Sequence, residues 1–246
     1  MRNPTSRVFV PLGLLAIACA AGLLVLAAVV SRQGSVGFDV PVITFVAGLG
    51  VMPEAWRAVT DLGAGVVLVP VGIGLVLWLL LRRRPATALL VGALLIAASL
   101  GSDVLKELVA RPRPPGEPLV PVQGFSFPSG HAVNSTVAFG LVALLAWRSG
   151  LALRARRIVT ALLVLAPFLV GLSRIGLGAH FPSDVVAGWL AGLAVVAAVG
   201  AVIVRAPGGG PVSGHGDPGP GQPVSPASRL LAPDRETDPP AVSGRG

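Results

Sequence analysis

Three short clusters of polar residues, separated by apolar stretches, carry the chemistry available to this chain. They are Lys106 with Arg113-Pro114, Pro128-Ser129-Gly130-His131, and Ser173-Arg174 with His180 and Asp184. Together they supply cations, two imidazoles, hydroxyl groups and one carboxylate. Such side chains are costly near a bilayer, so in an apolar chain they mark a functional site by default. A basic cluster with two histidines indicates a phosphate site.

His180 and Asp184 are spaced so that a carboxylate can support an imidazole. Pro182 suits the first turn of a helix, which places Asp184 in that turn and His180 just before it. A base held by an orienting group is the arrangement of an activated nucleophile. The pair is therefore the candidate reactive centre.

Lys106, Arg113 and Arg174 are candidates for binding the charge of a phosphoryl group, which enzymes meet with preorganised donors. Ser129 and the backbone N–H of Gly130 add neutral donors at a predicted helix start, which itself favours anions. Lys106 is the only lysine among the 19 basic residues, and a compact ammonium differs in its contacts from a guanidinium.

A metal site is not predicted. Only two useful histidines exist, no cysteine is near them, and Asp184 is the only evident carboxylate partner for a zinc ion. Taken singly, each histidine, arginine or glycine also has an ordinary explanation as a core residue, an interfacial anchor or a packing residue. The functional interpretation depends on the joint spacing of the three clusters.

The composition places these clusters in a membrane protein. Of the 246 residues, 53% are hydrophobic and 12% are charged, and the mean hydropathy is +0.81. The single cysteine, Cys19, lies in an apolar run, so no disulfide framework is available. A net charge of +8 would suit nucleic-acid binding, but the cations lie mainly in short loops between apolar runs, which favours a bilayer instead.

Six apolar runs have about the 17–25 residues that a spanning helix needs, the fifth being at the short end. They cover residues 8–30, 63–81, 85–105, 131–147, 158–173 and 183–204. The first run also fits a cleaved signal peptide, although it continues beyond the usual apolar core of one. Residues 34–62 mix acidic residues and prolines with apolar pairs, which predicts an interfacial amphipathic helix with turns.

The predicted fold is therefore all-α, an integral membrane bundle of six transmembrane helices within residues 1–205. After residue 205 the composition becomes rich in Pro, Gly and Ser, which predicts a disordered cytoplasmic tail over residues 206–246.

The basic residues of residues 1–205 also predict an orientation in the cell membrane. With both termini in the cytoplasm, ten of them lie inside and six outside, as the positive-inside rule requires. The ten are Arg2, Arg7, Arg82, Arg83, Arg84, Arg148, Arg154, Arg156, Arg157 and Arg205; the six are Arg32, Arg57, Lys106, Arg111, Arg113 and Arg174. All three clusters then fall at outer helix ends, so the site is expected to face outside.

Written as patterns, the clusters are Lys106-x6-Arg113-Pro114, Pro128-Ser129-Gly130-His131 and Ser173-Arg174-x5-His180-x3-Asp184. They resemble the three signature motifs of the type 2 phosphatidic acid phosphatase family of membrane lipid phosphatases, which is related to the vanadium haloperoxidases. The similarity covers about residues 60–200 and has no departure at a motif position. Arg111-Pro112 repeats the Arg-Pro pair, but the spacing from Lys106 selects Arg113 and leaves Arg111 as an auxiliary cation.

This resemblance implies a metal-independent phosphatase that needs no cofactor. His180 would attack phosphorus to form a phosphohistidine, while Asp184 fixes its tautomer and stabilises the imidazolium. His131 would protonate the leaving oxygen and then activate water. The expected substrate is a lipid phosphate of the prenyl diphosphate or phosphatidic acid type. Because the site is expected to face outside and Arg111 could meet the extra charge, a prenyl diphosphate such as undecaprenyl or decaprenyl diphosphate is expected to be preferred over phosphatidic acid. The resemblance alone equally allows phosphatidate, phosphatidylglycerophosphate or lysophosphatidate.

Two other functions stay open. A non-enzymatic phospholipid-binding or transport protein could use the same scaffold, but it would not need His131 and His180 together. A vanadium-dependent oxidising enzyme is disfavoured by the membrane spans. The expected partners are the lipid phosphate and membrane lipids, without nucleic acid, and the oligomeric state is open.

Overall fold

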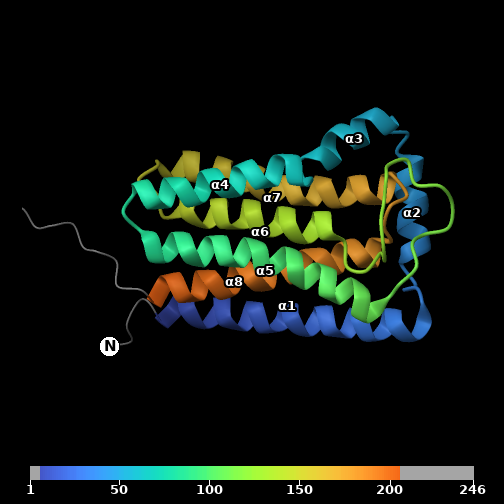
Figure 1. Cartoon of the computed structure of the whole chain (residues 1–246), viewed down its shortest axis with the longest axis horizontal. Coiled ribbons are helices and arrows are strands. Elements are labelled where there is room, and N and C mark those ends of the chain that lie inside the picture. Colours follow the sequence, from blue (N-terminus) through green and yellow to red (C-terminus); the bar gives the residue numbers. More distant parts are fainter. Residues whose placement is uncertain (1–5, 206–246) are drawn as a thin grey trace, which may run out of the picture. The chain divides into compact units, whose positions relative to one another are not determined.

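The structure, a computed structural model, describes residues 6–205 and folds them into eight α-helices (Figure 1). The helices are α1 (Ser6–Gln33), α2 (Asp39–Gly48), α3 (Pro53–Asp61), α4 (Gly65–Leu81), α5 (Pro85–Val109), α6 (Gly130–Trp147), α7 (Leu153–Gly176) and α8 (Pro182–Arg205). No β-strand occurs within these residues, and the all-α prediction is confirmed. The tail predicted over residues 206–246 lies outside the described residues.

Six segments of the described chain are long and apolar enough to cross a membrane. They are α1, the continuous stretch of α3 and α4, and the four helices α5 to α8. The prediction of six spans is therefore confirmed, and the chain is a multi-pass membrane protein. The fifth span is longer than predicted, because α7 begins at Leu153 and carries three arginines in its first two turns. Long arginine side chains reach the interface from such positions, so charge does not end the helix.

The stretch of residues 34–62, whose C-terminal part belongs to the second membrane-crossing segment, differs from its prediction. Instead of one interfacial amphipathic helix it contains two short helices, α2 and α3. Gly50 has a φ of +63°, a conformation that favours glycine, and Pro53 opens α3, so the chain turns between the helices. Only α3 is amphipathic, burying Trp56 and Thr60. α2 is apolar except for Asp39 and Thr44.

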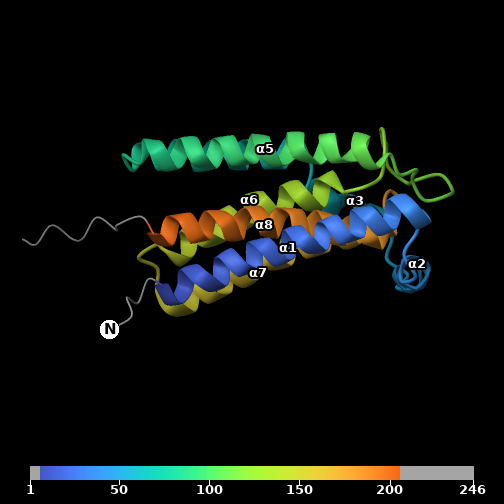
Figure 2. The ribbon, with the colours of Figure 1, turned by 90° about the horizontal axis from the view of Figure 1, so that it is seen from below.

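α6 and α8 form the centre of the bundle. In the most apolar stretch of each helix, half of the residues of α6 and 44% of those of α8 are buried inside the protein, against 11% for α1. Two glycines bring these helices together: a Cβ on Gly188 would lie 2.8 Å from Ser129 O, and one on Gly192 would lie 2.5 Å from Thr136 Cβ. Such small residues let helix backbones approach closely in membranes. Figures 1 and 2 both show α8 lying between α1 and α5.

Candidate active site

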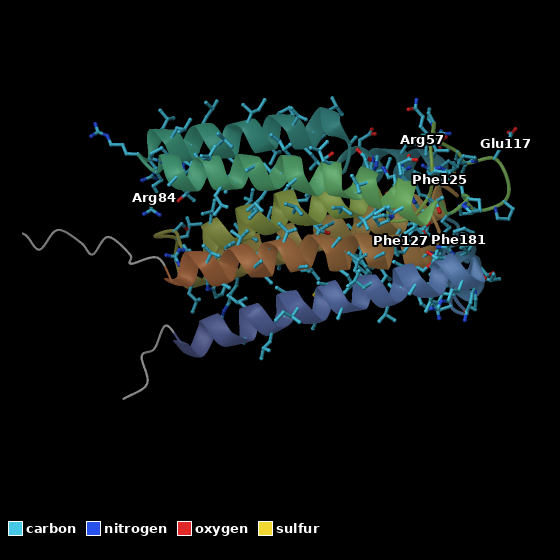
Figure 3. All side chains as sticks on the ribbon, turned by 60° about the horizontal axis from the view of Figure 1, so that its bottom comes forward. Arg57, Arg84, Glu117, Phe125, Phe127 and Phe181 are labelled. Carbon is cyan, nitrogen blue, oxygen red and sulfur yellow. The ribbon has the colours of Figure 1, made fainter. Side chains whose placement is uncertain are left out.

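The three polar clusters meet at one end of the bundle, where α5 and α7 end and α6 and α8 begin (Figure 1). The backbone N–H of Ser129 donates to Asp184 O at 3.0 Å. Lys106 Nζ lies 3.4 Å from the position that a Cβ on Gly130 would occupy. In Figure 3, Phe127 and Phe181 lie at this end and Arg84 at the opposite one. Residues up to 78 positions apart in sequence thus share one site.

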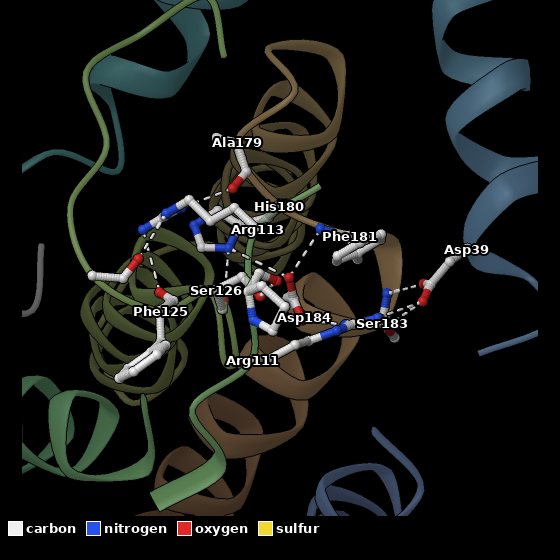
Figure 4. Close-up of polar contacts among 12 residues, drawn as sticks. Asp39, Arg111, Arg113, Phe125, Ser126, Ala179, His180, Phe181, Ser183 and Asp184 are labelled. Carbon is white, nitrogen blue, oxygen red and sulfur yellow. Dashed lines mark hydrogen bonds and ion pairs between the residues drawn. The ribbon is translucent and has the colours of Figure 1, made fainter. Parts of the chain in front are cut away.

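His180 occupies the connection between α7 and α8 and is 4% exposed. Its Nδ1 lies 2.8 Å from the carbonyl oxygen of Ser126 and 3.7 Å from Asp184 Oδ2 (Figure 4). The carbonyl is therefore the nearer orienting group, where sequence reasoning assigned that role to Asp184 alone. A proton held on Nδ1 by the carbonyl leaves the lone pair on Nε2, which is the form a nucleophile needs.

The electrostatic surroundings of His180 favour its neutral form. Burial lowers the pKa of His180 below its ordinary value; Asp184 opposes this shift, and Arg174 and Arg113 reinforce it. A buried imidazole beside cations is desolvated and repelled when protonated. His180 is consequently available as a base or nucleophile at neutral pH, while Asp184 remains close enough to stabilise a positive charge that forms on it.

Asp184 has a structural task as well as a chemical one. Its Oδ2 accepts the backbone N–H of Phe181 at 2.9 Å, and its Oδ1 accepts Arg111 Nη1. Asp184 is the third residue of α8, and a side chain there that binds the N-cap N–H matches one half of a capping box. The carboxylate is fully buried. It is thereby fixed against the helix start rather than free to rotate.

Arg111 does not occupy the place that the sequence suggested. It was expected to be a spare cation facing phosphate, but it is 2% exposed and its guanidinium is enclosed by protein acceptors. These acceptors are Gly34 O at 3.0 Å, Ser183 Oγ at 2.8 Å, Asp39 Oδ2 at 2.9 Å and Asp184 Oδ1 (Figure 4). Its carbon Cζ also lies 3.9 Å from the centroid of the Phe181 ring. The Arg111 guanidinium therefore binds the carboxylates of Asp39 and Asp184.

Arg113 lies on the other side of His180 and ties two segments together. Its guanidinium donates to Ala179 O at 2.8 Å, next to His180, and to three carbonyls of the loop before α6. The three are Gln123 O at 2.6 Å, Gly124 O at 3.1 Å and Phe125 O at 3.3 Å. Burial lowers the pKa of Arg113, and Asp184 counteracts this. Arg113 thus brings positive charge to the site and fixes the loop.

Arg174 and Ser129 present donors that the protein itself does not use. Arg174 is 5% exposed and donates from Nη1 to Thr60 Oγ1 at 3.1 Å. Its Nε is buried and has no hydrogen-bond partner among the described residues, and the same holds for Ser129 Oγ. Buried polar groups are nearly always paired, so unpaired donors in a cationic site point to an anionic ligand. Lys106 Nζ pairs with Asp103 Oδ1 at 2.8 Å and is partly exposed.

Comparison with known proteins identifies the family. A model of the PAP2 superfamily matches residues 86–206. Phosphatidylglycerophosphatase B of Bacillus subtilis is 33% identical over 141 residues, which cover 57% of this chain and 70% of that protein. The chain belongs to the PAP2 superfamily.

Two further proteins that resemble this PAP2 protein are also phosphatases. Decaprenylphosphoryl-5-phosphoribose phosphatase of Mycobacterium tuberculosis is 39% identical over 135 residues, which cover 52% of this chain and 66% of that one. The crystal structure of a PAP2-type phosphatidylglycerolphosphate phosphatase from Bacillus subtilis superposes with a TM-score of 0.67 at 27% identity. It covers 77% of this chain and 94% of that one. The predicted family and the prediction of a phosphatase of this family are confirmed.

His131 occupies the first turn of α6 in this PAP2 bundle and lies beside Gly63, which lines an apolar cavity. A Cβ on Gly63 would lie 3.2 Å from His131 Cδ2 and 2.5 Å from Val170 Cγ1, so only glycine fits beside the imidazole there. From Gly63 a cavity of about 460 Å³ continues between α4, α5 and α6. Most of its lining is aliphatic, including Leu68, Ile73, Val76 and Leu95. An apolar chamber therefore begins next to one of the two histidines.

Sequence reasoning missed four contributors to the site, namely Asp39, Thr60, Gly63 and Ser126. Asp39 carried one signal, because a lone carboxylate at the edge of an apolar stretch is costly unless it is paired. Ser126 acts through its backbone carbonyl, which no side-chain pattern can indicate. Thr60 accepts a hydrogen bond from Arg174, which lies 114 positions away in the sequence, so no local pattern indicates the contact.

Proposed function

We propose that this PAP2 protein hydrolyses a lipid phosphate monoester through a phosphohistidine formed on His180. The observation that carries the proposal is the set of groups around His180. Its Nδ1 is bound to a carbonyl, Asp184 is close by, and burial together with two arginines lowers its pKa. An imidazole that is oriented, neutral and surrounded by cations suits attack on a phosphoryl group.

In the first step, His180 Nε2 attacks phosphorus and the bond from phosphorus to the lipid oxygen breaks. His131 gives its proton to that leaving oxygen, so the lipid departs as an alcohol. In the second step, neutral His131 takes a proton from water as the water oxygen attacks phosphorus. Inorganic phosphate then leaves, His180 is regenerated, and His131 is again protonated.

Charge on the transferring group is met by side chains and by a helix start in this proposal. Lys106, Arg113 and Arg174 supply positive charge, and Ser129 Oγ with the Gly130 N–H supply neutral donors. Asp184 stabilises the positive charge that develops on His180. Among the described residues, no group of three or more His, Cys, Asp or Glu side chains could hold a metal ion.

The lipid nature of the substrate is supported by the apolar cavity that begins at Gly63, beside His131. A head group at the histidines would leave its hydrocarbon chain in contact with that cavity and with the bilayer. A monoester is favoured over a diphosphate because Arg111, the cation proposed to meet the second phosphate, is already bound to Asp39 and Asp184. The relatives from Bacillus and Mycobacterium are a phosphatidylglycerophosphatase and a decaprenylphosphoryl-5-phosphoribose phosphatase.

We further propose that the site faces the outside of the cell membrane and that both termini are cytoplasmic. The positive-inside distribution of arginine supports this orientation. In a Cys19→Ala background, Glu117→Cys should react with an impermeant thiol reagent in intact cells and Gly150→Cys should not. The reverse labelling pattern would invert the orientation and leave the chemistry untouched.

The activity is tested with purified protein in one detergent, in excess chelator, against phosphatidylglycerophosphate, phosphatidic acid and a prenyl diphosphate. We expect hydrolysis of the monoesters, with the diphosphate disfavoured in kcat/KM. His180→Ala should abolish turnover, and His131→Ala should reduce kcat by about 10²–10⁴-fold, as expected for a lost general acid. His215→Ala removes a histidine outside the three clusters and is the matched control.

Three outcomes would contradict the proposal. A strict requirement for added divalent metal would contradict the mechanism. A preference of tenfold or more in kcat/KM for the prenyl diphosphate would contradict the monoester as the preferred substrate. Binding of lipid phosphate without any turnover by the wild-type protein would favour the binding or transport alternative.

A further inference from the structure

A carboxylate outside the three clusters reaches the active site from α2. Asp39 is the first residue of that helix, and its side chain is fully buried although α2 lies outside the six membrane-crossing segments. It is separated from Ser183 by 144 positions in sequence. A buried carboxylate is expensive unless it is paired and hydrogen-bonded, so its contacts need an explanation.

Most hydrogen bonds of the Asp39 side chain lead to Arg111 and Ser183, which frame the site (Figure 4). Oδ1 accepts the backbone N–H of Ser183 at 2.8 Å. Oδ2 accepts Ser183 Oγ at 2.8 Å, Arg111 Nη2 at 2.9 Å and the backbone N–H of Val36 at 3.0 Å. Because Ser183 is the second residue of α8, Asp39 also places negative charge at the start of that helix, where it is favourable.

The surroundings of Asp39 favour its ionised form. Burial raises the pKa of Asp39, but hydrogen bonds from the Val36 and Ser183 backbone and from the Arg111 and Ser183 side chains outweigh it, and the net pKa is lowered. Arg111 is therefore held between two carboxylates, Asp39 at 2.9 Å and Asp184. The side chains of all three are at most 1% exposed.

The net charge of the three side chains Asp39, Arg111 and Asp184 determines how strongly they stabilise a protonated His180. Arg111 with Asp184 alone sums to zero, and such a pair gives an imidazolium little net stabilisation. With Asp39 the sum is one negative charge, in a buried setting where charges are weakly screened. The other charged or titratable groups that face His180 are Arg113, Arg174 and His131, none of which supplies negative charge.

We propose that Asp39 is a positioning residue that fixes Arg111 and keeps the Asp39–Arg111–Asp184 triad net negative toward His180. Asp39 touches neither His180 nor the phosphoryl group in this account, and it acts through Arg111 and Asp184. The inference rests on the proposed role of His180 as the nucleophile. It gives α2, a helix outside the motifs, a function in the reaction.

The test replaces Asp39 by Asn, which keeps the shape and removes the charge. kcat should fall by roughly 10–100-fold, the range seen when an outer-shell partner is lost, while KM changes by less than about threefold. The acid limb of the kcat/KM profile should move to lower pH, because His180 loses a net negative neighbour and its imidazolium is less stabilised. Asp39→Glu should restore part of kcat. Asp61→Asn removes an exposed carboxylate on α3 and should leave kcat unchanged.

A second readout does not depend on activity. The chain has three histidines, so ¹⁵N-histidine spectra can follow His180 directly, with His180→Gln giving its assignment. Its titration should move to lower pH in Asp39→Asn. An unmoved His180 titration together with full kcat, or with only a lower Tm, would make Asp39 a structural tether and overturn the proposal. A wild-type protein without any phosphatase activity would instead refute the proposed function, and the titration would still decide the role of Asp39.

Ser183→Ala is a second variant that tests the same network if Asp39→Asn does not yield folded protein. It removes an oxygen that lies 2.8 Å from both Asp39 Oδ2 and Arg111 Nη1, and it leaves the charges in place. kcat should fall by about threefold to tenfold without a shift of the acid limb, because geometry is loosened and charge is not. Full kcat in folded Ser183→Ala would contradict a positioning role for this network.

Discussion

The two ends of the bundle are both rich in arginine, yet their arginines behave differently. At the site end, Arg111 and Arg174 are 2% and 5% exposed, and they donate to carboxylates and hydroxyls. At the opposite end, the turn between α4 and α5 and the start of α7 carry exposed arginines, among them Arg84 and Arg154. Figure 3 shows Arg84 projecting at that end, away from the site.

The difference shows that residue type alone does not assign a role in this membrane protein. A buried guanidinium must be paired, so its position is fixed by partners and it can orient other groups. An exposed guanidinium at the interface is hydrated and mobile, and it contributes to orientation in the membrane. Counting arginines predicts topology, while their partners decide which of them take part in chemistry.

The largest effect is expected when one arginine is removed from the site end and compared with one removed from the opposite end. Arg174→Ala should reduce kcat by about 10²–10³-fold, the typical cost of losing one preorganised donor to a transition state. Arg154→Ala, at the exposed start of α7, should leave kcat within about twofold, since surface changes remote from a site have small effects. Both are measured as initial rates of phosphate release on equal amounts of folded protein. Equal losses at the two ends would show that charge, and not placement, is what matters.

A smaller effect is expected from the glycine that shapes the space around His131. Gly63→Ala places a methyl group against Val170 and the imidazole, which should lower kcat by about tenfold through misplacement of the general acid. Gly74→Ala is the matched control, because a Cβ there meets nothing within 4 Å. Circular dichroism and a thermal melt monitor folding of both variants. A Gly63→Ala enzyme with wild-type kcat would refute close packing as the reason for this glycine.

The smallest effect concerns pH. Attack requires neutral His180, and burial with two arginines lowers its pKa below the ordinary value of about 6.5. The neutral form is lost only as pH falls through the lowered pKa, so kcat/KM should stay near its plateau at pH 6.5 and decline below it. A pH series with a short-chain lipid phosphate measures this. An acid limb centred above pH 6.5 would contradict the electrostatic environment described for His180.

Hydropathy and motif spacing were sufficient to predict the all-α bundle, its six spans and the family. These features are written locally in the sequence, as runs of apolar residues or as residues at fixed spacing. The sequence did not predict that α2 and α3 are separate helices, because the turn between them depends on Gly50 and Pro53 within a mixed segment.

The role of Arg111 was also beyond prediction, since it depends on a partner far away in the chain. Its carboxylate contact Asp39 lies 72 positions earlier, and nothing in the spacing of either residue indicates that they meet. The same reason hides the contact of Thr60 with Arg174. Local patterns locate the reacting groups, whereas the groups that orient them come from tertiary packing.

The most direct test of the account is to trap the intermediate on His180. Lipid phosphate labelled with ³²P is mixed with excess enzyme, quenched with alkali within one turnover, and the labelled peptide is sequenced. We expect an acid-labile, alkali-stable label on His180, slower formation and slower loss of that label in His131→Ala because both steps lose their proton carrier, and no label in His180→Ala. Release of phosphate in a single turnover without any label on the protein, or a label on a different residue, would contradict it.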